Sequence, residues 1–396
     1  MSIAETAPAI RPRWFALDKL GVLIALIALA GVVLPFALFR ANRIVLGEPR
    51  AIFESLPAFA AGLLVVVLLI GFAAALLRLP PFIKLIAGFI ALAVLFVLIG
   101  QAAGHLTPPD NNFARVSPGA GFWLLVFAFA LLVADALTRL KLRPWPRIGL
   151  LVLVGALLAG LLWAGLWNDL SILKEYASRA PAFWQEARTH LLLAFGSVVI
   201  AVIIGVPLGI FCYRVKALRA AVLNVLNIVQ TIPSIALFGL LIAPLAWVAA
   251  NVPGASAIGI SGIGIAPAMV ALFAYSLLPV VANTVVGLEN VSPAAVDAAR
   301  GMGMTGVQRL FSVELPLAFP VILTGIRIVL VQNIGLATIA ALIGGGGFGV
   351  FVFQGIGQTA MDLVLLGAVP TVALAFAAAV VLDALVEMSS RGGRVE

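Results

Sequence analysis

The chain has 396 residues, of which 63% are hydrophobic and only 10% are charged, and its mean hydropathy is +1.21. A soluble globular protein does not carry so large an apolar fraction, so the composition indicates a membrane protein. The net charge of +8 does not indicate nucleic-acid binding, because the Lys and Arg residues lie at the ends of apolar stretches rather than in one patch. The single cysteine, Cys212, excludes an intrachain disulfide, and with only two histidines, His105 and His190, a metal cluster is not expected.

The chain contains about ten apolar stretches, each long enough for a membrane-spanning helix of about 20 residues. Membrane β-strands would show alternating polar and apolar residues, and the sequence lacks this alternation. We therefore expect an all-α membrane protein with about ten transmembrane helices. These helices are predicted at about 20–39, 56–77, 82–101, 121–140, 147–167, 190–212, 219–250, 264–287, 317–343 and 361–386.

A longer polar segment between the fifth and sixth stretches divides the chain. We expect residues 1–168 to form an N-terminal membrane extension of about five helices, residues 169–189 a periplasmic linker, and residues 190–396 a second membrane domain. The first stretch is expected to be an uncleaved span, because no small-residue cleavage site precedes Arg40. With a cytoplasmic N-terminus, most of the 24 basic residues fall on the cytoplasmic side, and the C-terminus lies there as well.

One of the few long polar interruptions in the chain runs from Asp297 to Pro316 and reads DAARGMGMTGVQRLFSVELP. Just before it, Ser292 and Pro293 supply an N-cap and a first-turn proline, so a short helix is predicted over 293–300. Gly301 and Gly303 follow directly and should end this helix.

A second short helix is predicted after the glycines. Thr305 lies three residues before Gln308, a capping-box spacing that opens a helix. We expect this helix to stop near Pro316, where the next apolar stretch begins. The whole segment is thus predicted as a helix-turn-helix at the cytoplasmic surface, and we call residues 289–316 the elbow.

The spacing of the elbow resembles the loop signature of permease subunits in ATP-binding-cassette (ABC) importers. That signature reads Glu-Ala-Ala, three residues, Gly, nine residues, Ile, one residue, Leu-Pro, and here Asp297 replaces the Glu and Val313 the Ile. The resemblance implies a coupling helix that docks on a separate ATPase subunit, whereas a plain surface loop is the alternative. The residues implied in coupling are Asp297, Ala298, Ala299, Arg300, Gly301, Gly303, Met304, Leu315 and Pro316.

A run of glycines follows the ninth stretch, at Gly344, Gly345, Gly346 and Gly347. It is not a phosphate-binding loop, because no lysine in the chain follows a glycine. We therefore expect this chain to bind no cofactor, with ATP and Mg²⁺ bound by a partner ATPase. The glycines are predicted to form either a flexible turn or a gate at the outer end of the span.

Charged residues within the membrane are few. Asp135, Asp362 and Asp383 all lie near span ends, which disfavours a proton-coupled carrier, although sodium coupling through carbonyl oxygens stays open. Arg327 lies about 15 Å into the ninth span at 1.5 Å per residue. No acidic partner is evident for it in the sequence, so it is expected either to snorkel to the inner surface or to face a wet cavity.

Polar residues cluster on three stretches of the second half. Asn224, Asn227, Gln230 and Ser234 recur at helical spacing, so they are predicted to share one face, with a kink at Pro233. Such a face either bonds neighbouring helices or lines a substrate path. The candidate path residues are Asn227, Gln230, Thr231, Pro233, Ser234, Tyr275, Asn283, Gln332 and Asn333.

Four motifs extend the family resemblance to about residues 184–390. His190-Leu191, Gly205-Val206-Pro207-Leu208-Gly209, the run NIVQTIPS from Asn227 to Ser234, and the run AARGMGMT from Ala298 to Thr305 resemble permeases of glycine betaine, choline and carnitine importers. The N-terminal half resembles Yeh-type permeases of the same branch.

The resemblance implies a five-helix core like that of type I importers, an ABC ATPase partner, a periplasmic binding protein and a second permease subunit, identical or paralogous. It implies transport of glycine betaine or a related osmoprotectant across the inner membrane by alternating access, without catalysis in this chain. An ABC permease for an amino acid or a sulfonate, and an ion-coupled carrier, are the alternatives.

Overall fold

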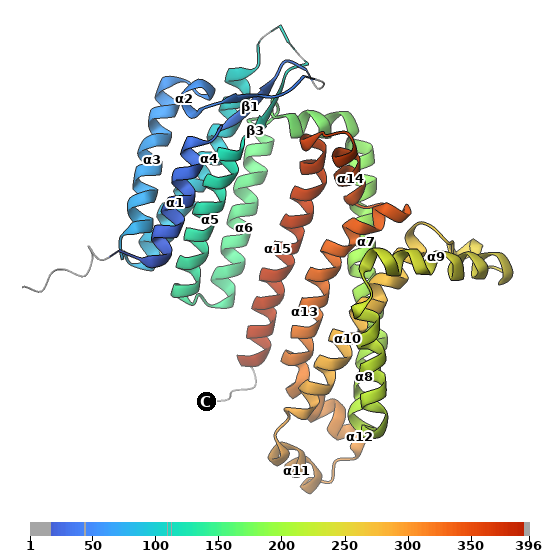
Figure 1. The fold of residues 1–396 in the computed structure, drawn as a ribbon. Helices are drawn as coiled ribbons and strands as arrows, with labels where there is room; N and C mark the ends of the chain where they lie inside the picture. The colour runs from blue at the N-terminus through green and yellow to red at the C-terminus, as the bar shows by residue number, and fades with distance from the viewer. Residues whose placement is uncertain (1–16, 43–44, 109, 112, 392–396) are drawn as a thin grey trace, which may run out of the picture. The chain divides into compact units, whose positions relative to one another are not determined.

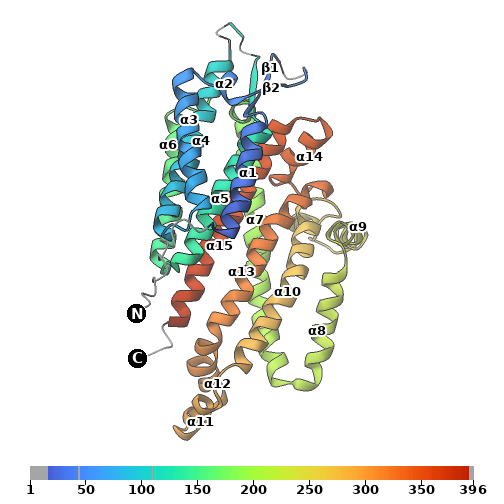
Figure 2. The same ribbon diagram turned by 60° about the vertical axis from the view of Figure 1, so that its left-hand side comes forward.

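The computed structural model describes residues 17–42, 45–108, 110–111 and 113–391. The molecule forms two compact units (Figures 1 and 2). The N-terminal unit comprises Met1–Leu142 with Leu153–Lys174, and the C-terminal unit comprises Arg143–Val152 with Glu175–Glu396. Within the described residues, nine helices are long and apolar enough to cross a membrane. This confirms the prediction of an all-α membrane protein.

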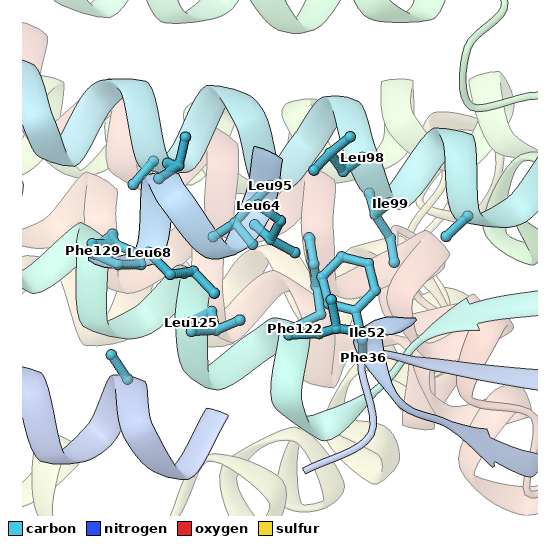
Figure 3. Packing of buried hydrophobic residues seen from close by; sticks show 14 of the residues in the cluster. Phe36, Ile52, Leu64, Leu68, Leu95, Leu98, Ile99, Phe122, Leu125 and Phe129 are labelled. Atoms are coloured by element: carbon cyan, nitrogen blue, oxygen red, sulfur yellow. The ribbon is translucent and has the colours of Figure 1, made fainter. Parts of the chain in front are cut away.

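The N-terminal unit is a bundle around one main apolar core. Its helices are α1 (Lys19–Val33), α2 (Ile52–Ser55), α3 (Ala58–Leu76), α4 (Pro81–Leu106) and α5 (Ala120–Leu140), while α6 (Pro144–Trp163) belongs to both units. Figure 3 shows Phe36, Ile52 and Phe122 meeting at one end of this core. Phe122 is fully buried and makes edge-to-face contacts with Phe36 and Phe96, with ring centroids 5.8 Å apart in each pair.

A small antiparallel sheet, absent from the sequence-based expectation, lies at the end of this unit. Its strands are β1 (Ala37–Arg40), β2 (Glu48–Arg50) and β3 (Arg115–Pro118), in the order β2-β1-β3. Leu38 lies opposite Pro49 on one side and Ser117 on the other. The first span therefore ends at Val33 rather than near residue 39, because the chain leaves the helix before Pro35 and pairs as a strand.

A charged cluster closes the opposite end of α1. Asp18 caps this helix by accepting from the Leu20 amide at 3.2 Å. Lys84, only 1% exposed, donates to Asp18 at 2.8 Å, and Arg139 lies 2.9 Å from the same carboxylate. Burial opposes the charge of Asp18, but the hydrogen bond from Lys84 and the charges of Lys84 and Arg139 together lower its pKa.

Apart from Arg143–Val152 of α6, the C-terminal unit runs from one long helix, whose first four residues belong to the N-terminal unit, to another. Its elements are α7 (Ser171–Arg214), α8 (Lys216–Thr231), α9 (Ser234–Asn251), η2 (Ser256–Ile258), α10 (Ile265–Glu289), α11 (Pro293–Gly301), α12 (Gly306–Arg309), the π-helix η3 (Leu310–Glu314), α13 (Leu315–Ile339), η4 (Ala340–Ile343), α14 (Gly349–Gly357) and α15 (Met361–Arg391). The segment predicted as a linker, 169–189, is helical from Ser171 onward. It departs from helical geometry at Arg179 (φ −130°, ψ 16°), two residues before Pro181.

The predicted seventh span, 219–250, is two helices and not one kinked helix. Helix α8 ends at Thr231, Ile232 is extended, and α9 begins after Pro233. Figure 1 shows α9 turning away from the axis of α8. Pro233 therefore separates the helices, and Ser234 does not share a face with Asn227 and Gln230 as predicted. The residue before a proline disfavours helical geometry, which explains a full break here.

The prediction that Arg327 lacks an acidic partner is wrong. Its guanidinium, on α13, donates to Asp383 of α15 at 2.5 Å, and Arg147 donates to the other oxygen of the same carboxylate, also at 2.5 Å. Arg147 also pairs with Glu387. Helices α13 and α15 pack side by side, so Arg327 and Asp383 meet although they are 56 positions apart in sequence. A single sequence does not reveal such a long-range pair.

Candidate functional site

The elbow lies beyond the ends of α10 and α13, at the end of the C-terminal unit where α7 turns into α8 (Figures 1 and 2). Helix α11 begins after Ser292 with Pro293 in its first turn, and it ends at Gly301. Gly303 has φ +79°, a left-handed conformation that reverses the chain at little cost only in glycine. The predicted first helix and the role of the glycine in the turn are confirmed.

The second arm of the elbow starts with the predicted capping box. The Gln308 amide donates to Thr305 Oγ1 at 3.2 Å, and the Thr305 amide donates to Gln308 Oε1 at 2.9 Å. The predicted stop near Pro316 is wrong. Helix α12 continues through the π-helix η3 into α13 without a break, so the second arm is a rigid extension of that span.

The residues predicted for coupling differ in exposure. Ala299 is buried, and Met304 and Leu315 are half-buried. The exposed members are Asp297, Ala298, Arg300, Gly301, Gly303 and Pro316. Asp297 and Arg300 form a surface ion pair of 3.3 Å, and their side chains are 69% and 61% exposed.

Sequence reasoning missed three apolar side chains on the elbow. Met302, Val307 and Phe311 are 70%, 68% and 64% exposed, and we call them the docking patch. Exposed apolar side chains within a polar rim are typical of protein-binding surfaces. The available signal was their occurrence in an otherwise polar interruption, with Val307 and Phe311 four residues apart.

The predicted path residues do not converge on one site. Gln230 of α8 donates to the Tyr275 carbonyl oxygen of α10 at 2.8 Å, and the Tyr275 hydroxyl donates to the Ile232 carbonyl oxygen at 2.5 Å. These two bonds fix the break between α8 and α9 against α10. The sequence left two alternatives for these polar residues, which were bonding to neighbouring helices or lining a substrate path. Gln230 and Tyr275 bond to neighbouring helices.

Asn333 lies at a second, separate node. It is fully buried, and its Nδ2 donates to Ser197 Oγ of α7 at 2.7 Å and to Ser276 Oγ of α10 at 2.8 Å. The two serines had no predicted role. Each serine hydroxyl donates to the backbone of its own helix, to Leu193 and Leu272, so its oxygen is left to accept from the amide.

The remaining predicted path residues lie elsewhere. Asn227 and Thr231 are exposed on α8, and Pro233 is exposed as the N-cap of α9. Ser234 and Gln332 are half-buried on α9 and α13. Asn283 donates to the Pro279 carbonyl oxygen within its own helix at 2.8 Å. No group of three or more His, Cys, Asp or Glu side chains that could hold a metal ion is found in the described part of the chain.

The glycine run forms a closed turn against α7. Gly344, Gly346 and Gly347 have φ values of +75°, +75° and +86°. The Gly347 amide donates to Glu186 Oε2 at 2.6 Å, and a Cβ atom at Gly346 would lie 2.9 Å from the same oxygen. The turn is therefore held by Glu186, and only glycine fits it.

Comparison with known proteins bears on both units. Residues 187–394 match the family described as binding-protein-dependent transport system inner membrane component. Residues 18–173 match the family described as ABC transporter permease YehY, N-terminal domain.

Individual relatives match the second half of the chain. The osmoprotectant import permease protein OsmW of Salmonella typhimurium is 46% identical over 194 residues, which cover 49% of this chain and 83% of the relative. The glycine betaine/carnitine/choline transport system permease protein OpuCB of Bacillus subtilis is 37% identical over 202 residues, covering 51% and 84%.

Among solved structures, the MetNI methionine ABC transporter in an inward-facing conformation matches 52% of this chain and 96% of its own. The identity is 22% and the TM-score 0.46. The family match spans more than half of the chain, and the relatives are covered over most of their length. The chain therefore belongs to the family of inner membrane permease components of binding-protein-dependent ABC transport systems.

Proposed function

We propose that this chain is the permease subunit of an ATP-driven importer that carries glycine betaine or a related quaternary amine by alternating access. The observation that carries the proposal is the elbow, with Gly303 in a left-handed turn, a capped second arm continuous with α13, and an exposed docking patch. The names of the relatives, which specify osmoprotectants, glycine betaine, carnitine and choline, support the substrate class.

In this proposal the elbow docks on a separate ABC ATPase in the cytoplasm, and that ATPase binds ATP and Mg²⁺. The distribution of basic residues supports the orientation. The elbow end carries Arg214, Lys216, Arg219, Arg300 and Arg309. Both termini of the chain then lie in the cytoplasm, and the glycine turn after α13 lies on the periplasmic side.

The proposed assembly also contains a periplasmic binding protein and a second permease subunit, identical or paralogous. Membership of a family of binding-protein-dependent transport components supports these partners. Asn227 and Thr231 of α8 and Ser234 of α9 remain candidates for the solute path.

The central experiment tests the turn of the elbow. Gly303→Val places a β-branched side chain at φ +79°, at a cost of about 1–3 kcal/mol. We expect at least about fivefold less co-purified ATPase and a similar loss of ATP-driven uptake, with normal membrane insertion. Gly306→Ala is the matched control, because Gly306 lies in the same elbow at the start of α12 and a Cβ atom there meets nothing within 4 Å.

The docking patch is tested by Phe311→Asp, which should release the ATPase because a buried charge without a partner opposes docking. Ile258→Asp is its control, since Ile258 is 78% exposed but lies in η2, outside the elbow. Uptake of labelled glycine betaine by the complete complex tests the substrate. Uptake of an amino acid or a sulfonate in its place would reassign the substrate, and gradient-driven flux without any ATPase would contradict the proposal.

A further inference from the structure

Glu314 is a buried carboxylate at the base of the elbow. It is only 1% exposed and closes the π-helix η3, directly before α13. A buried carboxylate is costly unless it is paired and hydrogen-bonded. Its position among apolar side chains therefore calls for a compensating interaction.

Two arginines from different elements supply that interaction. Arg309 of α12 donates through Nε to Glu314 Oε1 at 2.7 Å, and Arg214 donates through Nη2 to Oε2 at 3.1 Å. Each carboxylate oxygen thus has its own guanidinium. Arg309 is five residues from Glu314 within the second arm, but Arg214 is the last residue of α7, 100 positions away in sequence.

The π-helix lies directly before a proline. Pro316 has no amide hydrogen, so the ordinary helical bond to the carbonyl oxygen of Ser312 does not form. In the preceding turn the Leu315 amide donates to the Leu310 carbonyl oxygen, five residues back. The wider turn brings Arg309 and Glu314 onto one side, and π-helical turns of this kind often mark functional positions.

One apolar cluster joins the same elements. Leu310 and Leu315 of the second arm, and Ile210 and Tyr213 of α7, all pack against a buried cluster that includes Leu288 of α10. Arg214 also lies over the Tyr213 ring, 5.7 Å from its centroid. Helix α7 leads from this cluster to Ser197, and α13 leads from it to Asn333, so the two helices meet again at the buried amide node.

We propose that Glu314 is a positioning residue that locks the elbow to the end of α7. When the elbow moves with the ATPase, the Arg309–Glu314–Arg214 cluster transfers that movement to α7 and α13 together. This inference rests on the proposed function. It adds the contact inside the permease through which movement of the elbow is transmitted to the membrane helices. Without the cluster the ATPase still docks, but hydrolysis no longer drives the solute.

The test uses the complete complex of permease, ATPase and binding protein in proteoliposomes, with uptake per ATP hydrolysed as the readout. Glu314→Gln keeps the shape of the side chain and removes its charge. We expect the complex to assemble and to hydrolyse ATP, with uptake per ATP at least about fivefold lower. Arg214→Gln removes only the α7 contact and should lower the ratio as well, and the effects of the two changes should not add.

Arg219→Gln is the matched control. Arg219 forms an ion pair with Glu289, which is the last residue of α10 and the first of the elbow, so this pair joins the elbow to α8 and not its second arm to α7. Its loss should leave uptake per ATP unchanged. An equal fall in Arg219→Gln would mean that any ion pair at this end suffices, and it would overturn the inference.

A reversible cross-link separates a mechanical role from a merely structural one. In a Cys212→Ser background, Arg214→Cys with Glu314→Cys can be joined by a short bis-methanethiosulfonate reagent. We expect cross-linking to restore uptake per ATP and a reductant to abolish it again. Full coupling in Glu314→Gln, or a cross-link that restores nothing, would refute the lock. If the unmodified chain retains no ATPase, the proposed function itself fails, and that result is visible before any variant is measured.

Discussion

The two units each bury a charged side chain at a helix end, but in different surroundings. Lys84 of the N-terminal unit lies beside Asp18 at the edge of one main apolar core. Glu314 of the C-terminal unit lies between helices whose buried apolar residues fall into separate clusters. The N-terminal unit adds to its main core only a small cluster of Leu85, Val133 and Ala136. One large core resists relative movement of its parts more than several clusters joined by polar contacts do. We therefore expect the charged cluster around Asp18 and Lys84 to stabilise the fold, and the charged cluster around Glu314 to couple the elbow to the membrane helices.

The largest effect on stability is expected from Asp18→Asn. This change leaves Lys84, 1% exposed, without its carboxylate partner, and such losses cost about 3–5 kcal/mol. Thermal unfolding in detergent should show a clear decrease in Tm, while uptake per ATP stays normal. Asp110→Asn, on an exposed connection, is the control. A fall in uptake per ATP without a fall in Tm would show that the Asp18 cluster serves coupling and not stability.

A smaller effect is expected at the amide node of the C-terminal unit. Asn333→Ala removes the donor shared by Ser197 and Ser276. Interhelical hydrogen bonds in membrane proteins contribute about 0.6 kcal/mol and at most about 1.7 kcal/mol. A double-mutant cycle with Ser276→Ala should give a coupling energy in this range. A coupling energy near zero would show that the hydrogen bond between Asn333 and Ser276 does not help to hold α10 and α13 together.

Asp383→Asn removes the carboxylate that Arg327 and Arg147 share, but Asp383 and Arg327 are each 37% exposed whereas Lys84 is buried, so the loss of stability should be smaller than that of Asp18→Asn. Denaturant unfolding in detergent measures this difference. A loss as large as that of Asp18→Asn would show that α13 and α15 are held by charge rather than by packing.

The smallest effect is the pH dependence of the Asp18 cluster. The pKa of Asp18 is lowered from its ordinary value of 3.8, so its contribution is complete above that value and is lost as the pH falls through the folded pKa. The Tm should therefore decrease as the pH falls below about 4, and part of that decrease should be absent in Asp18→Asn. An identical acid profile in both proteins would exclude this carboxylate as the cause.

Local signals in the sequence predicted the elbow well. The N-cap and proline at Ser292 and Pro293 define α11, and the Thr305–Gln308 box opens α12. Both depend on bonds within a few residues, which a sequence displays directly. The coupling role of these residues remains a prediction from resemblance.

Features that depend on distant residues could not be predicted. The strands pair residues near 38 with residues near 117, Arg327 meets Asp383, and Glu314 meets Arg214. Each of these contacts depends on how distant elements pack in three dimensions. A single sequence does not show which distant residues meet. The break at Pro233 was a different error, since a proline within an apolar stretch can either kink a helix or end it, and here Tyr275 holds the ended helix by bonding Ile232.

The three-stranded sheet has a consequence for biosynthesis. Strands β1 and β2 leave the ribosome before α3 and α4, but β1 pairs on its other side with β3, which is translated only after both helices. All three strands must reach the same side of the membrane, so β1 keeps an open edge until the α3–α4 hairpin has been inserted. The sheet is therefore completed only once residues 115–118 have been translated, and a stalled chain lacking them would present that edge to other proteins.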